Sequence, residues 1–265
     1  MTDPNAPRVF RLRSIFVEQG RLAMLSHLEV AHALERTVRR ADLPFAVSQG
    51  FSPHMKIAFG AALPVGVGST CEIFDLQLTH YVAPDKALAA LQAASVPDLM
   101  VQECAYIDNK APAASVAFPF STYEVVFDEV VDQDAIQVPD TITVVRKRKE
   151  KELVVAEFLA EPFKVGETGS DVRVGANDSM RADVSAGECV GVRADTCAGT
   201  RASEHVDVCA GSRSSSRATF TLEAKPTGSL RPDVLLEHCS IPARVISITR
   251  ISQTCEFACP RALKY

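Results

Sequence analysis

The sequence lacks long apolar runs, and its N-terminus lacks the features of an export signal. Its apolar stretches are far shorter than the roughly 20 residues that a membrane-spanning helix needs. The first residues, Met1-Thr2-Asp3-Pro4, contain neither the basic nor the apolar region of a signal peptide. Without an export signal, the eight scattered cysteines are expected to stay reduced. These absences predict a cytoplasmic, globular protein with no membrane contact.

The chain also lacks an excess of basic residues. Its formal net charge of −5 argues against a protein that coats nucleic acid indiscriminately, because such binding requires many phosphates to be neutralised. The charge is uneven, however, since eight Lys and Arg residues stand against four Asp and Glu residues between Arg8 and Lys56. We therefore expect a local anion-binding face in this N-terminal segment.

The segment from Ser26 to Ser69 is the most informative part of the sequence. Ser26 and Glu29 have the spacing of a capping box, which predicts a helix start at Ser26. Pro44 predicts the end of this helix, since proline disfavours a helical conformation at the residue before it. Helical spacing predicts a core face made of Leu28, Ala31, Leu34, Val38 and Ala41. The opposite, cationic face contains His32, Arg36, Arg39 and Arg40.

Four ordered motifs in this segment resemble those of the radical-SAM-linked protein family. This is a bacterial family of unknown function whose members are encoded beside, or fused to, a radical SAM enzyme. The motifs are Ser26-His27-Leu28-Glu29, Arg39-Arg40-Ala41-Asp42-Leu43-Pro44, Gly50-Phe51-Ser52-Pro53-His54 and Leu63-Pro64-Val65-Gly66-Val67-Gly68-Ser69. A looser match is Ser-Leu-Arg-Pro at residues 229–232. The resemblance implies a radical SAM enzyme as the partner and leaves this chain's own chemistry open.

The elements expected in residues 8–110 follow the order β-α-β-β-α-β. Besides the capped helix, we expect strands at residues 8–18, 45–59 (a strand or a hairpin), 71–78 and 99–107, and a helix at 84–94. This order is typical of the ferredoxin-like split β-α-β domain, an α+β fold in which the helices cover one face of the sheet. Residues 111–114 are expected to be a linker.

A second α+β domain is expected at residues 118–251. The patterns predict strands at residues 122–127, 142–146, 219–224 and 244–250, and helices at 150–159 and 232–238. This order suggests a second ferredoxin-like unit, although no sequence repeat links the two halves.

Twelve-residue repeats interrupt this second domain. Asp171, Asp183, Asp195 and Asp207 are each followed four residues later by glycine. Residues 167–217 contain no Leu, Ile, Phe, Tyr or Trp, so they offer little to bury and are expected to form a disordered insert. Calcium-binding loops are an alternative, but the acidic ladder of an EF-hand is absent.

Cys255 and Cys259 have the spacing of the first two cysteines in the CxxxCxxC iron–sulfur motif of radical SAM enzymes. The third position is Ala262, so this chain does not hold such a cluster by that motif. The difference favours a partner over a catalyst, and we expect neither a metal nor another cofactor on this chain. A structural or incidental role is the simpler interpretation of the two thiols.

His27 and His54 are the candidate acid–base residues of the informative segment. His27 lies in the first turn of its helix, where the positive end of the helix dipole disfavours its protonation and favours a neutral base. A catalytic role requires both rings to face one groove. The alternative is that both are hydrogen-bonded structural residues.

Further candidates for RNA contact are basic and aromatic. Lys56 extends the cationic face, and a basic segment comprises Arg146, Lys147, Arg148 and Lys149. Solvated surface charge is an equally simple interpretation of that segment. Phe51 and Phe59 are expected to be exposed aromatics that stack on bases.

Two functions of different classes fit these patterns. The first is a non-catalytic partner that binds or presents RNA to a radical SAM enzyme. The second is a metal-independent endoribonuclease in which His27 and His54 act as acid and base, because the segment is weakly similar to the nucleases that process CRISPR repeats.

Overall fold

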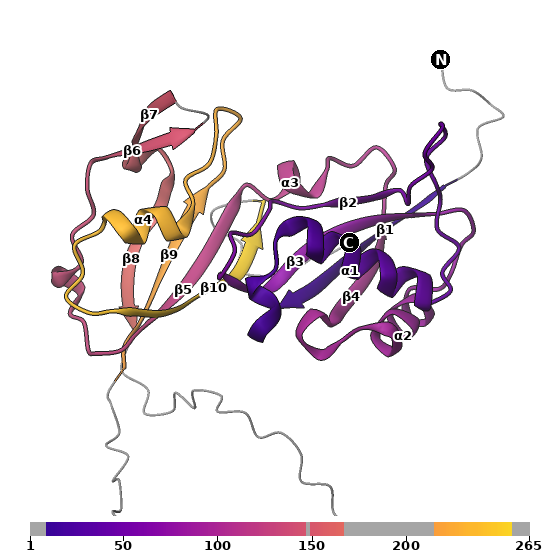
Figure 1. Ribbon diagram of the computed structural model, residues 1–265, viewed down its shortest axis with the longest axis horizontal. Helices are drawn as coiled ribbons and strands as arrows, with labels where there is room; N and C mark the ends of the chain where they lie inside the picture. The colour runs from indigo at the N-terminus through magenta and orange to yellow at the C-terminus, as the bar shows by residue number, and fades with distance from the viewer. Residues whose placement is uncertain (1–8, 147–148, 167–214, 256–265) are drawn as a thin grey trace, which may run out of the picture.

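The computed structural model describes residues 9–146, 149–166 and 215–255 (Figure 1). Its first half contains β1 (Phe10–Glu18), α1 (His27–Arg40), β2 (Ile57–Phe59), β3 (Gly68–Leu78), α2 (Pro84–Ala94) and β4 (Val101–Ile107). The predicted order β-α-β-β-α-β is therefore confirmed. In the sheet, β4 pairs with β1, β1 with β3 and β3 with β2, and all three pairs are antiparallel.

The second half contains two more strands than the sequence predicts, β7 and β8. Its elements are α3 (Ala114–Ala117), β5 (Phe120–Phe127), β6 (Thr141–Arg146), β7 (Lys149–Val154), β8 (Leu159–Gly166), β9 (Arg217–Glu223), α4 (Pro232–His238) and β10 (Val245–Thr254). Here β10 pairs with β5, β5 with β9 and β9 with β8, all antiparallel. If β6 and β7 are set aside, the four strands of each half lie in the same order, with the last strand beside the first and the third beside the second.

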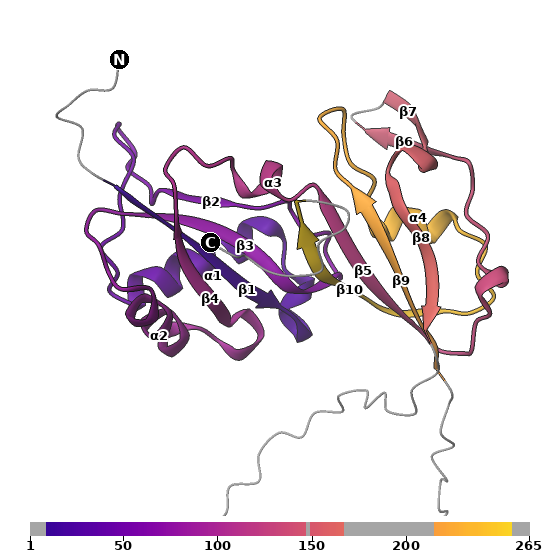
Figure 2. The same cartoon turned by 180° about the vertical axis from the view of Figure 1, so that it is seen from behind.

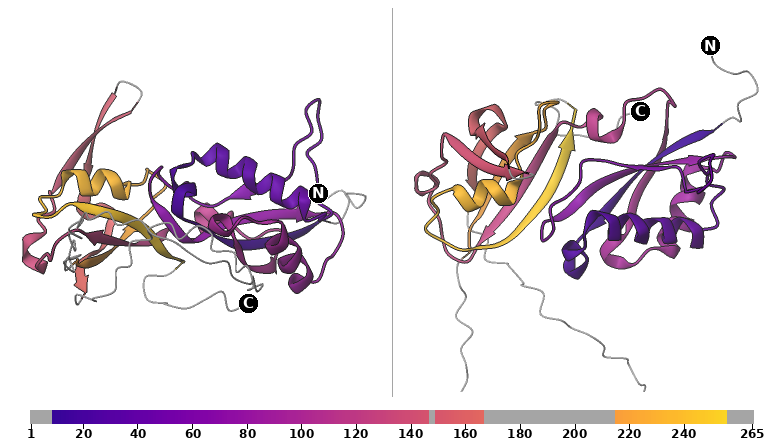
Figure 3. Two further views of the ribbon diagram at one scale, coloured as in Figure 1. Left: turned by 60° about the horizontal axis from the view of Figure 1, so that its bottom comes forward. Right: turned by 45° about the horizontal axis from the view of Figure 1, so that its top comes forward.

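The two halves join in one mixed, mostly antiparallel sheet (Figures 1 and 3). The junction is the parallel pairing of β10 with β3, where Thr249 lies opposite Gly68 and Arg250 opposite Ser69. The buried apolar side chains form two clusters. One contains Leu34 of α1 and Leu91 of α2 packed on the first half, and the other contains Leu235 of α4 packed on the second.

The prediction of a helix at residues 150–159 is wrong. Residues 149–154 form β7, which pairs with β6 as a separate two-stranded hairpin, and β8 begins at Leu159. The Lys and Glu residues of this segment have a high helix propensity, but cross-strand pairing and the burial of Ile142 in the second core favour the hairpin. The hairpin thus takes the chain position that a helix occupies in the first half.

Helix α1 begins where the capping box predicts. The Glu29 carboxylate accepts hydrogen bonds from the backbone N–H and the hydroxyl of Ser26, at 2.8 and 2.7 Å. Leu28, expected in the core, is 69% exposed. The buried residues of the helix are Val30, Leu34, Thr37 and Val38, because the side of the helix that carries them, and not Leu28, packs on the first core.

The twelve-residue repeats lie outside the described residues, except for their last positions. Ser215 and Ser216 are buried, and Arg217 opens β9 opposite Gly166 of β8. Residues 215–217, the last three of the expected insert, are therefore part of the folded structure, and residues 167–214 lie outside the described residues. Among the residues described, no helix is long and apolar enough to span a bilayer.

Candidate functional site

The cationic face of α1, made of His32, Arg36, Arg39 and Arg40, is exposed to solvent as predicted. Arg39 forms an ion pair with Glu35 at 3.2 Å, and Arg40 donates to the carbonyl of Ala94 at 2.8 Å. Within the described part of the chain, Arg36 has no hydrogen-bond or ion-pair partner. All three guanidinium groups therefore keep donors that face solvent.

Two other arginines of the basic N-terminal segment are not available to a ligand. Arg11 and Arg13 both bind the carboxylate of Asp75, each with a shortest distance of 2.7 Å, and Arg13 and Asp75 are buried. Both arginines also donate to backbone carbonyls of the segment at Ala111 and Pro112. They hold the segment at Ala111 and Pro112 against the sheet. The local excess of free positive charge is therefore smaller than the sequence suggests.

The remaining basic candidates are only partly described. Lys56 is exposed just before β2, beside a surface hollow that His54 and Asp75 also line. The side chains of Arg146, Lys147, Arg148 and Lys149 lie outside the described residues.

The two aromatic candidates differ in their exposure. Phe51 is fully exposed, as expected for a stacking residue. Phe59 is not an exposed aromatic: its ring packs edge-on against His27, with 5.4 Å between centroids, and at a tilt against Phe74, with 6.3 Å between centroids. The β2–β3 pairing directs this side chain toward the first core, so that expectation is wrong.

The structure does not bring His27 and His54 to one groove. His27 lines a small hollow with Glu18 and Glu72, whereas His54 lines the separate hollow near Lys56. The Nδ1 atom of His54 lies 3.0 Å from the hydroxyl of Ser48 and 3.2 Å from the carbonyl of Ser52. These contacts brace the turn that carries Phe51, which agrees with the structural interpretation of His54.

Glu18 is a buried carboxyl that the sequence analysis missed. It is 5% exposed and has no hydrogen-bond partner among the described residues. Burial and the nearby charge of Glu72 raise the pKa of Glu18 to about 7, although Arg250 acts to lower it. The sequence signal is a carboxylate that directly follows the apolar residues Ile15, Phe16 and Val17 at the end of β1.

Arg250 links the two halves of the sheet. Its Nη1 donates to Glu72 at 2.8 Å and to the carbonyl of Ala61 at 3.1 Å, both in the first half. Its Nε and Nη2 donate to the hydroxyl of Tyr123 in the second half, at 3.2 and 2.9 Å. Burial acts to lower the pKa of Arg250, but Glu72 and Tyr123 outweigh it, so the pKa is raised and the guanidinium stays charged.

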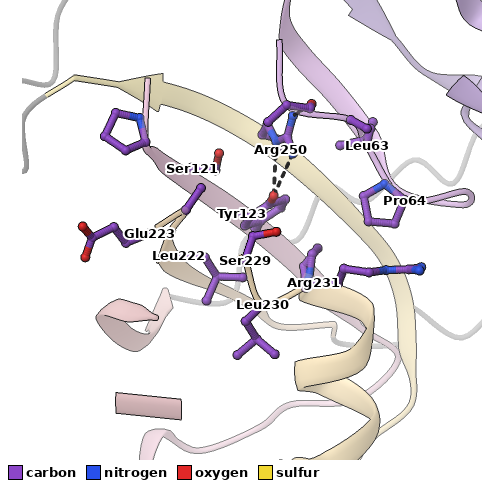
Figure 4. Close-up of a pocket in the computed structure, with 15 residues that line it drawn as sticks. Leu63, Pro64, Ser121, Tyr123, Leu222, Glu223, Ser229, Leu230, Arg231 and Arg250 are labelled. Carbon is purple, nitrogen blue, oxygen red and sulfur yellow. Dashed lines mark hydrogen bonds between the residues drawn. The ribbon is translucent and has the colours of Figure 1, made fainter. Parts of the chain in front are cut away.

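A cavity of about 370 Å³ opens beside Arg250 and Tyr123, and we call it the seam pocket (Figure 4). Leu63 and Pro64, from one motif of the sequence analysis, form one side of it. Residues 229–232, the looser Ser-Leu-Arg-Pro match, form another. Segments far apart in the sequence thus meet at the junction of the two halves. Within the described residues, no group of three or more His, Cys, Asp or Glu side chains is arranged to hold a metal ion.

The thiols described by the structure are unpaired. Burial raises the pKa of Cys71 and of Cys239 to about 11, and Glu72 adds to the shift at Cys71. These two thiols are therefore protonated at neutral pH and poor nucleophiles. Cys255 is exposed, and Cys259 lies outside the described residues.

Comparison with known proteins finds a matching family. No curated protein matches the sequence. A bacterial family described as "uncharacterized protein conserved in bacteria (DUF2344)" matches residues 11–167. This range is more than half of the chain and includes α1, the Leu63-Pro64 loop and both ends of the β6–β7 hairpin. The chain therefore belongs to this DUF2344 family of bacterial proteins.

Proposed function

We propose that the chain is a non-catalytic partner of a radical SAM enzyme and that it binds an RNA substrate through the cationic face of α1. The observation that carries the proposal is the exposure of His32, Arg36, Arg39 and Arg40 on one side of a helix whose other side is buried. The partnership itself rests on the four motifs of the segment from Ser26 to Ser69.

Phosphate binding requires cations that are both exposed and free to donate. Arg36 has no partner in the described part of the chain, while Arg39 and Arg40 use only part of their donor capacity. Arginine suits this role because its planar group binds phosphate oxygens in pairs. The ion pair of Arg39 with Glu35 is exposed, so a phosphate can compete with it at little cost.

The proposal includes a ferredoxin-like fold for both halves. The antiparallel order β4-β1-β3-β2, with α1 and α2 on one face, supports it for the first half. The matching order β10-β5-β9-β8 supports it for the second half, with the β6–β7 hairpin in place of the first helix. Sheets of this type are common in RNA-binding modules.

The geometry does not favour the endoribonuclease alternative. Acid–base cleavage of RNA needs two groups within reach of one phosphodiester, whereas His27 and His54 line different hollows. His27 also packs edge-on against Phe59. The non-catalytic partner therefore remains the function that the site supports best.

RNA binding is tested with a triple variant of α1, Arg36→Gln, Arg39→Gln and Arg40→Gln. Loss of three phosphate contacts should lower the affinity for single-stranded RNA at least tenfold and flatten the slope of log K against log salt by about 2. Fluorescence anisotropy over a range of salt concentrations measures both quantities. Incubation in chelator should leave the RNA uncleaved, because the chain has no cleavage step of its own.

The matched control carries the same loss of charge elsewhere. Arg244→Gln, Lys164→Gln and Arg217→Gln remove three exposed cations of the second half. This control should retain the affinity and salt slope of the wild type. An equal loss in both triple variants, or no RNA binding at low salt, would refute the RNA proposal, and failure to co-purify with the neighbouring radical SAM enzyme would refute the partnership.

A further inference from the structure

The seam pocket contains more hydrogen-bond donors than the protein uses. The side chain of Arg250 has five N–H groups. Four of them donate hydrogen bonds within the protein, to Glu72, Ala61 and Tyr123. The Tyr123 hydroxyl accepts from Arg250, and its own hydrogen has no acceptor among the described residues. One arginine N–H and the tyrosine O–H are therefore available at the wall of the cavity.

Two serines add unused hydroxyls to this wall. Ser121 is 8% exposed, and its side chain has no hydrogen-bond partner in the part of the chain that the structure describes. Ser229, on the loop before α4, is exposed and likewise has no side-chain partner there. Figure 4 shows both serines beside the Arg250–Tyr123 pair. A ligand acceptor at this place could therefore bind hydroxyls that make no hydrogen bond to the described residues.

The buried positive charge of the pocket is already neutralised. Arg250 is paired with Glu72 inside the protein, whereas the exposed Arg231 forms an ion pair with Asp233 at the rim. A free anion deep in the cavity, beside Arg250, would find no unpaired cation to compensate its charge. The unused donors therefore suit a neutral ligand that offers carbonyl oxygens or ring nitrogens.

The rest of the cavity is apolar and has the size of a ligand site. Leu63 and Pro64 lie on one side, and Leu222 lies across from them with Leu230 below (Figure 4). Apolar walls with a few converging polar groups are typical of small-molecule sites, and about 370 Å³ lies within their usual range. A flat heterocycle with acceptors on one edge fits both the walls and the donors.

We infer that the seam pocket receives one unpaired nucleobase that carries ring carbonyl groups, such as uracil. The inference rests on the proposed RNA-binding function, in which the base belongs to the bound strand and is turned out of any stack. In this arrangement the four unused donors bind the carbonyl oxygens of the base. Adenine, which lacks carbonyl groups, should bind less well.

Calorimetric titration of the full chain with free nucleosides tests the pocket. Uridine should bind saturably, and adenosine at least fivefold more weakly. Ser121→Ala and Ser229→Ala should each weaken uridine binding several-fold, and Ser229→Trp, which fills the entrance, should abolish it. Ser247→Ala removes an exposed hydroxyl of β10 away from the pocket and should have no effect.

The α1 triple variant separates this inference from the RNA proposal. It should bind uridine as the wild type does, since none of its substitutions lines the pocket. If wild-type protein binds no nucleoside, or if Ser229→Trp binds uridine normally, the inference is wrong even when RNA binding and its salt dependence behave as proposed. If uridine binds but RNA does not, the pocket is a nucleoside site and the RNA proposal is the part that fails.

Discussion

At the scale of single residues, Glu18 has the clearest energetic consequence. Its pKa is raised in the folded protein to about 7, mainly by burial and then by Glu72. The folded state therefore favours the protonated carboxyl, and the stability from this group is present at low pH and lost as the pH rises from about 4.5 to about 7. Glu18 destabilises the protein at neutral and alkaline pH.

Glu18→Gln should remove this pH dependence. At pH 8 the variant should be more stable than the wild type by the order of 3 kcal/mol, and at pH 4.5 the two should be nearly equal. Urea denaturation at both pH values measures the difference. Glu29→Gln is the opposite control: the hydrogen bonds from Ser26 lower the pKa of Glu29, so this variant should lose stability at pH 8. A pH-independent effect of Glu18→Gln would contradict the assigned pKa.

At the scale of elements, the cap of α1 organises the segment that carries the motifs. Ser26→Ala removes the hydroxyl that binds Glu29 and caps the first turn. We expect a loss of about 1 kcal/mol in the free energy of unfolding, the usual cost of a lost N-cap. Thermal or urea denaturation measures it, with Ser247→Ala as an exposed control. An unchanged stability would mean that the cap contributes nothing to the fold.

Local signals predict the elements whose ends have a local chemical cause. The capping box predicts the start of α1, and prolines at the first turn predict α2 and α4 with their observed bounds. The hairpin at β7 escapes prediction because its strand pairing is decided by β6 and by the second core. Leu28 and Phe59 are misplaced for a similar reason, since packing between elements sets which face is buried.

The candidate site is less predictable than the elements. The cationic face of α1 follows from helical spacing within one segment, so the sequence alone reveals it. The seam pocket combines residues near positions 63, 123, 230 and 250, and only the strand order brings them together. The spacing of these residues along the sequence does not predict that they lie close together, because their proximity depends on the pairing of β3 with β10.

At the scale of the whole molecule, the repeat segment leaves and rejoins the sheet at one place. Gly166 and Arg217 lie opposite each other in the β8–β9 pair, so a short connection can join the two strands (Figure 2). Replacing residues 169–213 with Gly-Gly-Ser should leave the melting temperature nearly unchanged, because loop length has a small effect on closure entropy. Ser216 must be kept, since its hydroxyl bonds Val131 and Glu129.

Calorimetric melting of this shortened chain provides the measurement. A matched deletion that also removes Ser215 and Ser216 should melt earlier, because it takes away the buried hydrogen bonds that anchor the start of β9. If replacing residues 169–213, with Ser215 and Ser216 kept, already abolishes cooperative unfolding, the repeats contribute to the core.

The narrow junction between β3 and β10 determines how easily the two halves of the molecule move relative to each other. Only Thr249 and Arg250 of β10 are in register with β3, whereas β1 is paired along most of its length. Few backbone hydrogen bonds resist a small rotation of one half against the other. The main side-chain hydrogen bonds between the two halves are those of Arg250. A molecule bound in the seam pocket, between Leu63 and Leu230, would contact both halves at once. Ligand binding at this one place would therefore restrict the rotation of the two halves relative to each other.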